Sequence, residues 1–272
     1  DLKLYDTFSG VLAMAPPKTY RCEAVTLSYT PLSEADLLVT MYTRDQGKVR
    51  AVGKGARRST SKLIGHLEPL TVVKMSLANG RSMDIISQVE VIQSFSGLKD
   101  HLSGISKGLY LAELVDGFGA EDSPNPGLYQ LMIDTLTFLE AEPESDMPLR
   151  FFEFQLLQLS GLMPELYHCV ECRIELEPDT HRFSPNMGGT LCLECNPEDA
   201  HLRPLSLRAL KVLRLLHRSG IAEACRLSID SSLGDELKSL LSTTVSYWLG
   251  KEIRSNSFIE RLHNETLPEV YK

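Results

Sequence analysis

The sequence lacks the features that mark membrane proteins and several large catalytic classes. No apolar run reaches the roughly 18–20 residues that a membrane-spanning helix needs, and the first residues contain no apolar core of a secretory signal. The motifs H-E-x-x-H, G-x-G-x-x-G and G-x-x-x-x-G-K-[ST] are absent. We therefore expect a cytoplasmic protein that is not an enzyme.

Positive charge is scarce in the chain as a whole, which has 28 Lys and Arg against 36 Asp and Glu and a net charge of −8. One segment, residues 44–62, has a net charge of +6, so the remainder carries −14. Its seven basic residues, opposed only by Asp45, are Arg44, Lys48, Arg50, Lys54, Arg57, Arg58 and Lys62. Because local fields govern the docking of a polyanion, this segment is a candidate nucleic-acid surface. A solvated loop without a ligand is the alternative.

Alternating apolar residues and turn signals predict five strands between residues 20 and 96. The expected strands are Glu23–Tyr29, Asp36–Tyr42, Gly47–Val52, Leu70–Leu77 and Met83–Phe95. The dipeptide Asn79-Gly80 is a strong hairpin signal. Five strands with few helical patterns between them are typical of a small barrel. The count fits the OB-fold, and an SH3-like barrel is the main alternative.

From Leu98 onward the apolar residues recur every three or four positions, which predicts helices. Helices are expected at about 98–117, 128–140, 149–160, 206–217, 221–228 and 233–253. We therefore expect an α+β multidomain fold. Its parts are an N-terminal segment at 1–19 that matches no pattern, a five-stranded OB-fold β-barrel at 20–97, and an α-helical domain at 98–272 with an inserted four-cysteine zinc site at 168–196.

Four of the six cysteines form two matched pairs. Cys169 and Cys172 make one C-x-x-C, and Cys192 and Cys195 make another, with 19 residues between the pairs. Each pair can place two sulfurs on a tight turn, and two facing turns complete a tetrahedron around one ion. Thiolates favour zinc, and four of them leave no open coordination position, so we expect one structural Zn2+. A redox dithiol, an iron–sulfur centre and a degenerate site without metal are the alternatives.

The basic segment divides into an expected strand and a loop. Two residues of the strand, Lys48 and Arg50, face the same side because alternate strand residues share a face. The loop, Gly53–Ser61, is rich in glycine and carries further cations. Cations along one barrel face and an adjoining loop are typical of OB-folds that follow a nucleic-acid backbone. The candidate DNA-binding residues are Lys48, Arg50, Lys54, Arg57, Arg58 and Lys62.

Two other classes of function remain open from these residues. The acidic remainder of the chain favours basic partners, so the protein could be an interaction scaffold with a structural zinc and no direct role on DNA. It could also be an enzyme whose catalytic groups converge from distant positions in the chain. The salt dependence of DNA binding separates the first alternative from a phosphate-binding site, and a deep pocket lined by titratable groups favours the second.

The order of these motifs resembles the RecO family of bacterial recombination mediators. The segments Glu34–Thr43 (EADLLVTMYT) and Gly47–Arg58 (GKVRAVGKGARR) are similar to the N-terminal barrel of that family. Ser160–Cys172 (SGLMPELYHCVEC) resembles the entry to its zinc site, and Phe183-Ser184, Gly188-Gly189 and Cys192–Cys195 resemble the exit. The resemblance extends from about Tyr20 to the last expected helix.

The resemblance implies a function in recombinational DNA repair without covalent catalysis. Members of the family bind single- and double-stranded DNA, anneal complementary strands and act with RecR. Together with RecR they help to load RecA onto DNA coated by single-strand-binding protein. The resemblance also implies an OB-fold at 20–96, DNA contact by the six cations named above, and zinc on the four paired cysteines.

Overall fold

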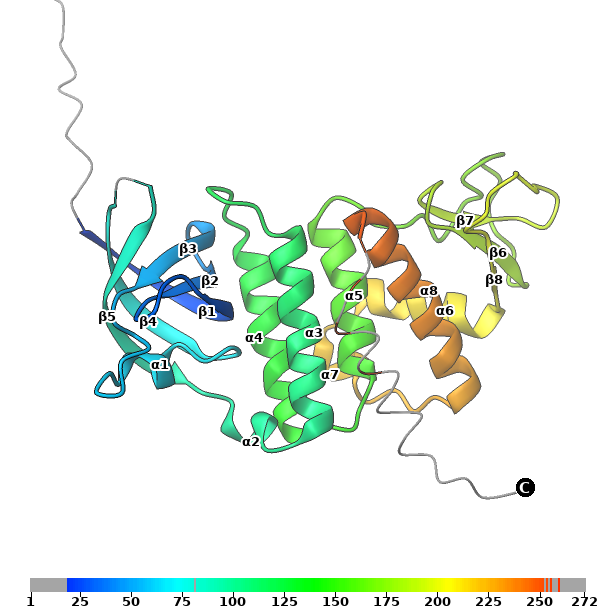
Figure 1. The fold of residues 1–272 in the computed structure, drawn as a ribbon. Coiled ribbons are helices and arrows are strands. Elements are labelled where there is room, and N and C mark those ends of the chain that lie inside the picture. Colours follow the sequence, from blue (N-terminus) through cyan, green and yellow to red (C-terminus); the bar gives the residue numbers. More distant parts are fainter. Residues whose placement is uncertain (1–18, 81, 252, 254, 256–258, 260–272) are drawn as a thin grey trace, which may run out of the picture.

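The computed structural model describes residues 19–80, 82–251, 253, 255 and 259. Figure 1 shows three parts along the molecule: a β-barrel at one end, a group of helices in the middle, and a small sheet at the other end, after which the chain returns to the middle for its last helices. The expected N-terminal segment lies, apart from Thr19, outside the described residues. The fold is of the α+β class, as predicted.

The N-terminal part is a closed barrel in which the five strands follow the order β1-β2-β3-β5-β4. Strand β1 pairs antiparallel with both β2 and β4, and β3 pairs parallel with β5 at Ala51–Asp84 and Val52–Ile85. This closed five-stranded topology is that of the OB-fold. The strands are β1 (Thr19–Pro31), β2 (Leu37–Thr43), β3 (Gly47–Gly53), β4 (Val72–Ala78) and β5 (Asp84–Gln93), and the short helix α1 (Leu63–His66) precedes β4.

The barrel interior follows the alternation that the sequence predicts. Val39 and Met41 of β2 and Ala51 of β3 are fully buried and point inward. Their neighbours Lys48 and Arg50 lie on the outer side, because successive strand residues face opposite ways. The strand register pairs Thr40 with Arg50 and Tyr42 with Lys48. Both cations therefore lie on the outer surface that β2 and β3 form together.

Helices fill the central part and pack on the barrel with one continuous hydrophobic core. They are α2 (Ser96–Lys99), α3 (Leu102–Phe118), α4 (Pro126–Ala141), α5 (Met147–Leu159), α6 (Leu207–Arg218), α7 (Ile221–Ala224) and α8 (Ser231–Leu249). Asn125 caps α4 by accepting the Leu128 N–H at 3.0 Å. In the part of the chain that the structure describes, no helix is both long and apolar enough to span a bilayer.

Three expected helices differ clearly from those observed, and the one expected at 221–228 is only the four-residue helix α7. The helix expected from Leu98 is divided, because His101 adopts an extended backbone and α3 begins only at Leu102. Helix α2 crosses the first turn of α3 so closely that a Cβ on Gly104 would lie 2.7 Å from the Leu98 carbonyl oxygen. The last helix ends at Leu249, before the expected Ile253, because Gly250 takes a left-handed conformation with φ 68°.

The cysteine-rich insert and the segment directly after it form a small sheet that periodicity does not predict. Its order is β7-β6-β8, with β6 (His181–Ser184) in the centre, β7 (Gly189–Leu191) and β8 (Arg203–Leu205). Strands of three or four residues are too short to show an alternating pattern. Figure 1 places this sheet at the end of the molecule opposite the barrel.

Candidate metal centre and nucleic-acid interface

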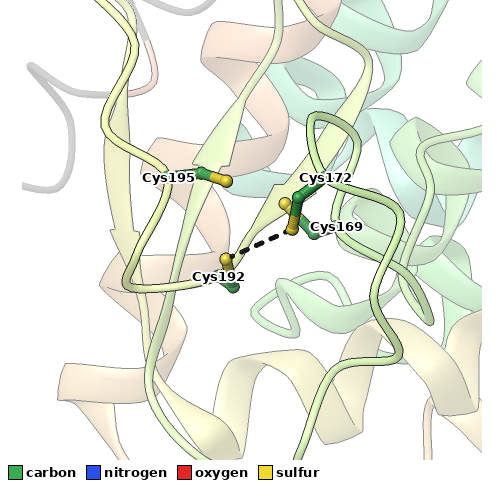
Figure 2. A group of neighbouring side chains, drawn as sticks. All are labelled: Cys169, Cys172, Cys192 and Cys195. Carbon is green, nitrogen blue, oxygen red and sulfur yellow. Dashed lines mark hydrogen bonds between the residues drawn. The ribbon is translucent and has the colours of Figure 1, made fainter.

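The structure brings the two cysteine pairs together, although 19 residues separate them in the sequence. The four sulfur atoms lie within 4.8 Å of one another, and Cys172 Sγ is 3.7 Å from Cys192 Sγ. Figure 2 shows the four side chains pointing toward a common centre from two facing loops. Cys169 and Cys192 are buried, whereas Cys172 is exposed, so the cluster lies at the edge of the insert.

The first pair lies on a tight turn held by backbone hydrogen bonds. The Cys169 N–H donates to the Ile174 carbonyl at 2.8 Å, and the Arg173 N–H donates back to the Cys169 carbonyl at 3.0 Å. Arg173 has a positive φ of 66°, which closes the turn. The Val170 N–H donates to the Thr190 carbonyl of β7 at 2.9 Å. This last bond ties the first turn to the strand that leads into the second pair.

The second pair depends on the two preceding glycines and on one arginine. Gly188 adopts a left-handed φ of 73°, and a Cβ on Gly189 would lie 2.6 Å from the Glu165 carbonyl oxygen. Arg182 of β6 donates from Nη2 to the Leu193 carbonyl at 2.5 Å and from Nη1 to Asn196 Oδ1. The backbone between and after the two cysteines is therefore fixed from the neighbouring strand.

Hydrogen bonding around the sulfurs favours thiolates at one position. Burial alone raises the pKa of the Cys169 thiol, but N–H groups of Cys172, Cys192 and Glu171 bond to its sulfur and lower the pKa to about 6. Burial and hydrogen bonds among the neighbouring thiols raise the pKa of Cys195. Without a cation Cys169 therefore loses its proton more readily than Cys195, and a bound cation favours the thiolate form of its sulfur ligands.

The spacing of the sulfurs fits a tetrahedral ion. A metal–sulfur distance of about 2.3 Å implies that neighbouring sulfurs of a tetrahedron lie about 3.8 Å apart, close to the 3.7 Å between Cys172 and Cys192. A donor set of four sulfurs suits soft or borderline ions and does not suit magnesium or calcium. A complete tetrahedron leaves no position for water, so such an ion holds the fold and does not activate a nucleophile.

The six candidate DNA-binding cations fall into two groups, and Lys48 belongs to the first. Its ammonium donates to the Asp116 carbonyl at 2.6 Å and lies 3.3 Å from Asp116 Oδ1. Asp116 is in the last turn of α3, where backbone carbonyls lack helical partners and a cation is favourable. Lys48 therefore caps α3 from the barrel, an intramolecular role that the expectation of DNA contact does not include.

Arg50 also faces the helical part rather than open solvent alone. Its Nε lies 3.6 Å from Glu121 Oε1, with both side chains about half exposed. The loop carrying Glu121 forms β-bridges with Gly47 and Lys48 at the start of β3. A Cβ on Gly47 would lie 2.5 Å from the Ser123 carbonyl oxygen, so the loop packs tightly against this strand.

The second group comprises four exposed cations on the loop between β3 and β4, which we call the basic loop: Lys54, Arg57, Arg58 and Lys62. The backbone of this loop is anchored, since the Gly55 N–H donates to Asp36 Oδ1 at 2.8 Å and the Arg57 N–H donates to the Ala35 carbonyl at 2.9 Å. Among the described residues, no carboxylate forms an ion pair with any of the four. Arg57 Nη1 donates to the Ser33 carbonyl oxygen at 2.7 Å, so the loop holds four exposed cations on a fixed backbone, one of them bonded to the neighbouring turn.

Sequence reasoning missed the acidic partners of the first group and a buried polar cluster. Asp116 and Glu121 have no local signal, because their partners lie about 70 positions earlier in the chain. In the helical core, the Tyr110 hydroxyl donates to Glu153 Oε1 at 2.6 Å, and Arg150 Nη1 lies 3.1 Å from Glu153 Oε2. A charged residue at an apolar helical position is the only sequence signal for this cluster.

One sequence, Gly104-Ile-Ser-Lys-Gly108, matches the G-x-S-x-G pattern of some hydrolases. It lies inside α3, whereas a nucleophile elbow requires a turn between a strand and a helix. The Ser106 side chain is buried, and its hydroxyl donates to the Leu102 carbonyl one turn earlier. This serine is a helix residue bonded to its own backbone and is not placed as a nucleophile.

Comparison with known families matches both parts of the chain. The family described as Recombination protein O N terminal matches residues 14–95, and the family described as Recombination protein O C terminal matches residues 101–257. The chain belongs to the RecO family. The interval between the two RecO matches coincides with α2, where the barrel gives way to the helices.

Relatives named DNA repair protein RecO are similar over nearly the whole chain. One from Dehalococcoides mccartyi is 32% identical over 249 residues, which cover 92% of this chain and 98% of the relative. One from Desulforudis audaxviator is 35% identical over 245 residues, covering 90% and 98%. One from a Roseiflexus species is 36% identical over 243 residues, covering 89% and 86%. RecO family membership therefore connects this chain with DNA repair and recombination.

Proposed function

We propose that this chain is a DNA-binding recombination mediator and not an enzyme. It binds single- and double-stranded DNA, anneals complementary strands, and acts with RecR to help load RecA onto DNA coated by single-strand-binding protein. Its place of action is the nucleoid in the cytoplasm. The repair and recombination role of the RecO family supports the general assignment, and the charge of the barrel supports direct contact with DNA.

The observation that carries the proposal is the basic loop. Its four cations, Lys54, Arg57, Arg58 and Lys62, are exposed on an OB-fold in a protein of net charge −8. OB-folds hold single strands through a cationic groove or loop that follows the backbone. We assign phosphate contact first to these four residues. Lys48 and Arg50 contribute only where a strand displaces Asp116 or Glu121 from them.

We propose one Zn2+ held by Cys169, Cys172, Cys192 and Cys195. The four converging sulfurs and the short distance between two of them support this assignment. The ion cross-links the two cysteine turns and takes no part in a reaction on a substrate. Elemental analysis of the purified protein should find one zinc per folded chain, and its absence from folded, DNA-binding protein would overturn the assignment.

The DNA site is tested by reversing two charges of the basic loop. The variant R57E/R58E replaces two cations by two anions, which lowers the net charge from −8 to −12. The control R21E/K74E makes the same change in net charge at two exposed positions of β1 and β4 on the same barrel. We expect R57E/R58E to bind a labelled single strand at least tenfold more weakly than the wild type at low salt, and the control to bind within about threefold.

The two variants separate a specific site from a general effect of charge. Equal losses in both would show that net charge alone controls binding. Unchanged affinity in R57E/R58E would remove the basic loop as the site and favour the alternative function, a protein-interaction scaffold. Circular dichroism and zinc content of each variant establish that the fold is retained.

A further inference from the structure

Helix α6 is the second place where positive charge gathers, and only one of its cations forms an ion pair with a described carboxylate. Its twelve residues include Arg208, Lys211, Arg214 and Arg218 and no Asp or Glu. Arg208 forms an ion pair with Asp230. No ion pair with a described residue involves the other three cations. In a protein with an excess of acidic residues, a helix of this composition is a candidate for an anionic ligand.

The three unpaired cations form one row along the solvent side of the helix, which we call the α6 row: Lys211, Arg214 and Arg218. Spacings of three and four residues place side chains on the same face. The opposite face is apolar and buried by Leu210, Leu213 and Leu216. At about 1.5 Å per residue the α6 row is about 10 Å long, and one strand of a duplex carries a phosphate about every 3.4 Å along the axis.

The two arginines of the α6 row are held in fixed positions. Arg214 donates from Nε and Nη2 to the Leu166 carbonyl at 3.0 and 2.7 Å, and its guanidinium lies 4.7 Å from the centre of the Tyr167 ring. Arg218 donates from Nε to the Arg214 carbonyl at 3.1 Å. Side chains that are already ordered lose less conformational entropy when they bind a ligand. Arg214 Nη1 and both terminal nitrogens of Arg218 have no partner among the described residues.

The chemistry of the α6 row fits phosphates rather than bases. Guanidinium groups bind phosphate oxygens with charge-assisted and often bidentate hydrogen bonds. Helix α6 contains no Phe, Tyr or Trp on which a base could stack, and the nearby Tyr167 ring is already covered by Arg214. Binding through the α6 row is therefore independent of base sequence.

The α6 row and the basic loop lie in different parts of the molecule. Figure 1 shows α6 on the side of the central helices that faces away from the barrel, toward the cysteine-rich sheet. The basic loop leaves β3 at the barrel. A strand held at the basic loop therefore leaves α6 open to a second strand.

We propose that the α6 row is a second nucleic-acid site, which binds the phosphate backbone of one strand while the basic loop binds the other. This inference rests on the proposed function and adds a place for the complementary strand during annealing. Two separate sites for the DNA backbone raise the local concentration of one strand near the other. Neither strand has to be base-paired before it binds.

The test uses the full chain and three variants of equal net charge. K211E/R218E changes the α6 row, R57E/R58E changes the basic loop, and R21E/K74E is the control. Arg214 is left intact because it also packs on Tyr167. We measure the number of short labelled single strands bound per chain at saturation, and the rate at which each protein anneals complementary strands.

We expect two strands per chain for the wild type and the control, and one for K211E/R218E. The strand that remains on K211E/R218E should bind within about twofold of the affinity of the basic loop in the wild type, and annealing should slow at least tenfold. Unchanged stoichiometry and annealing in K211E/R218E would overturn the second site. A K211E/R218E protein that keeps both DNA activities and loses only the ability to bind an acidic protein would also overturn it.

The result separates this inference from the proposed function. If R57E/R58E binds one DNA strand fewer than the wild type and K211E/R218E does not, the basic loop is supported as a DNA site and the α6 row is refuted. If K211E/R218E binds one DNA strand fewer and R57E/R58E does not, the α6 row is supported as a DNA site and the assignment of the basic loop is refuted. Should K211E/R218E unfold, K211Q/R218Q removes the same charges without reversing them and carries the same expectation.

Discussion

Replacing Lys48 by Met tests whether this cation serves the fold or the DNA. The substitution keeps the aliphatic stem against the barrel and removes the ammonium that contacts the Asp116 carbonyl and carboxylate. Hydrogen bonds that involve a charged group contribute about 1.5–3 kcal/mol. The Lys48 side chain is only 13% exposed, so solvent replaces little of this contact. We expect the free energy of unfolding to fall by about 2 kcal/mol.

Differential scanning calorimetry measures this loss as a fall in melting temperature of roughly 4–8 °C for a chain of this size. The matched control is Lys54→Met, because Lys54 is exposed on the basic loop and has no ion pair with a described residue. Its stability should change by less than about 0.5 kcal/mol. In a DNA titration we expect Lys54→Met to have the larger effect of the two. It should weaken DNA binding severalfold, whereas Lys48→Met should change the affinity by less than about twofold.

The opposite pattern would refute this reasoning. A Lys48→Met protein that melts with the wild type and loses DNA affinity tenfold would show that the ammonium leaves Asp116 for phosphate. In that case the contact between the barrel and α3 holds the cation only until DNA arrives, and Lys48 joins the basic loop as a DNA-binding residue.

Three further substitutions test the metal centre and the helical core. Cys169→Ser should abolish stoichiometric zinc and reduce hydrogen-exchange protection in the helical part while the barrel keeps its own, since metal binding and folding are coupled. Gly189→Ala places a Cβ 2.6 Å from the Glu165 carbonyl oxygen, so the turn must shift, and competition with a chelator should show zinc affinity at least tenfold lower. Tyr110→Phe leaves Glu153 Oε1 without its 2.6 Å donor in the core, which should cost about 1–3 kcal/mol in urea unfolding.

The barrel could be predicted from the sequence because its signals are local. Alternation around Val39, Met41 and Ala51 locates the inner face, and the same alternation places Lys48 and Arg50 outside. The paired cysteine spacing predicts that four sulfurs meet, and the structure brings them within 4.8 Å.

The remaining features depend on contacts between distant segments, which no local pattern records. The division of the first helix at His101 results from the packing of α2 across Gly104. The pairing of Lys48 with Asp116 joins the barrel to the end of α3. The strands of the cysteine-rich sheet are only three or four residues long, so their periodicity is invisible. The α6 row does have a sequence signal, since its basic residues recur at helical spacing, and only the structure shows that no described carboxylate pairs with them.

The salt dependence of single-strand binding tests the central claim most directly. Four phosphate contacts from the basic loop predict a slope of about −2.8 in a plot of log affinity against log salt, or about a fiftyfold loss between 50 and 200 mM. R57E/R58E leaves two contacts, so its slope should be about −1.4 under conditions where only the loop site is filled. A wild-type affinity that scarcely changes with salt, or equal slopes for the two proteins, would contradict electrostatic binding of the backbone by this loop.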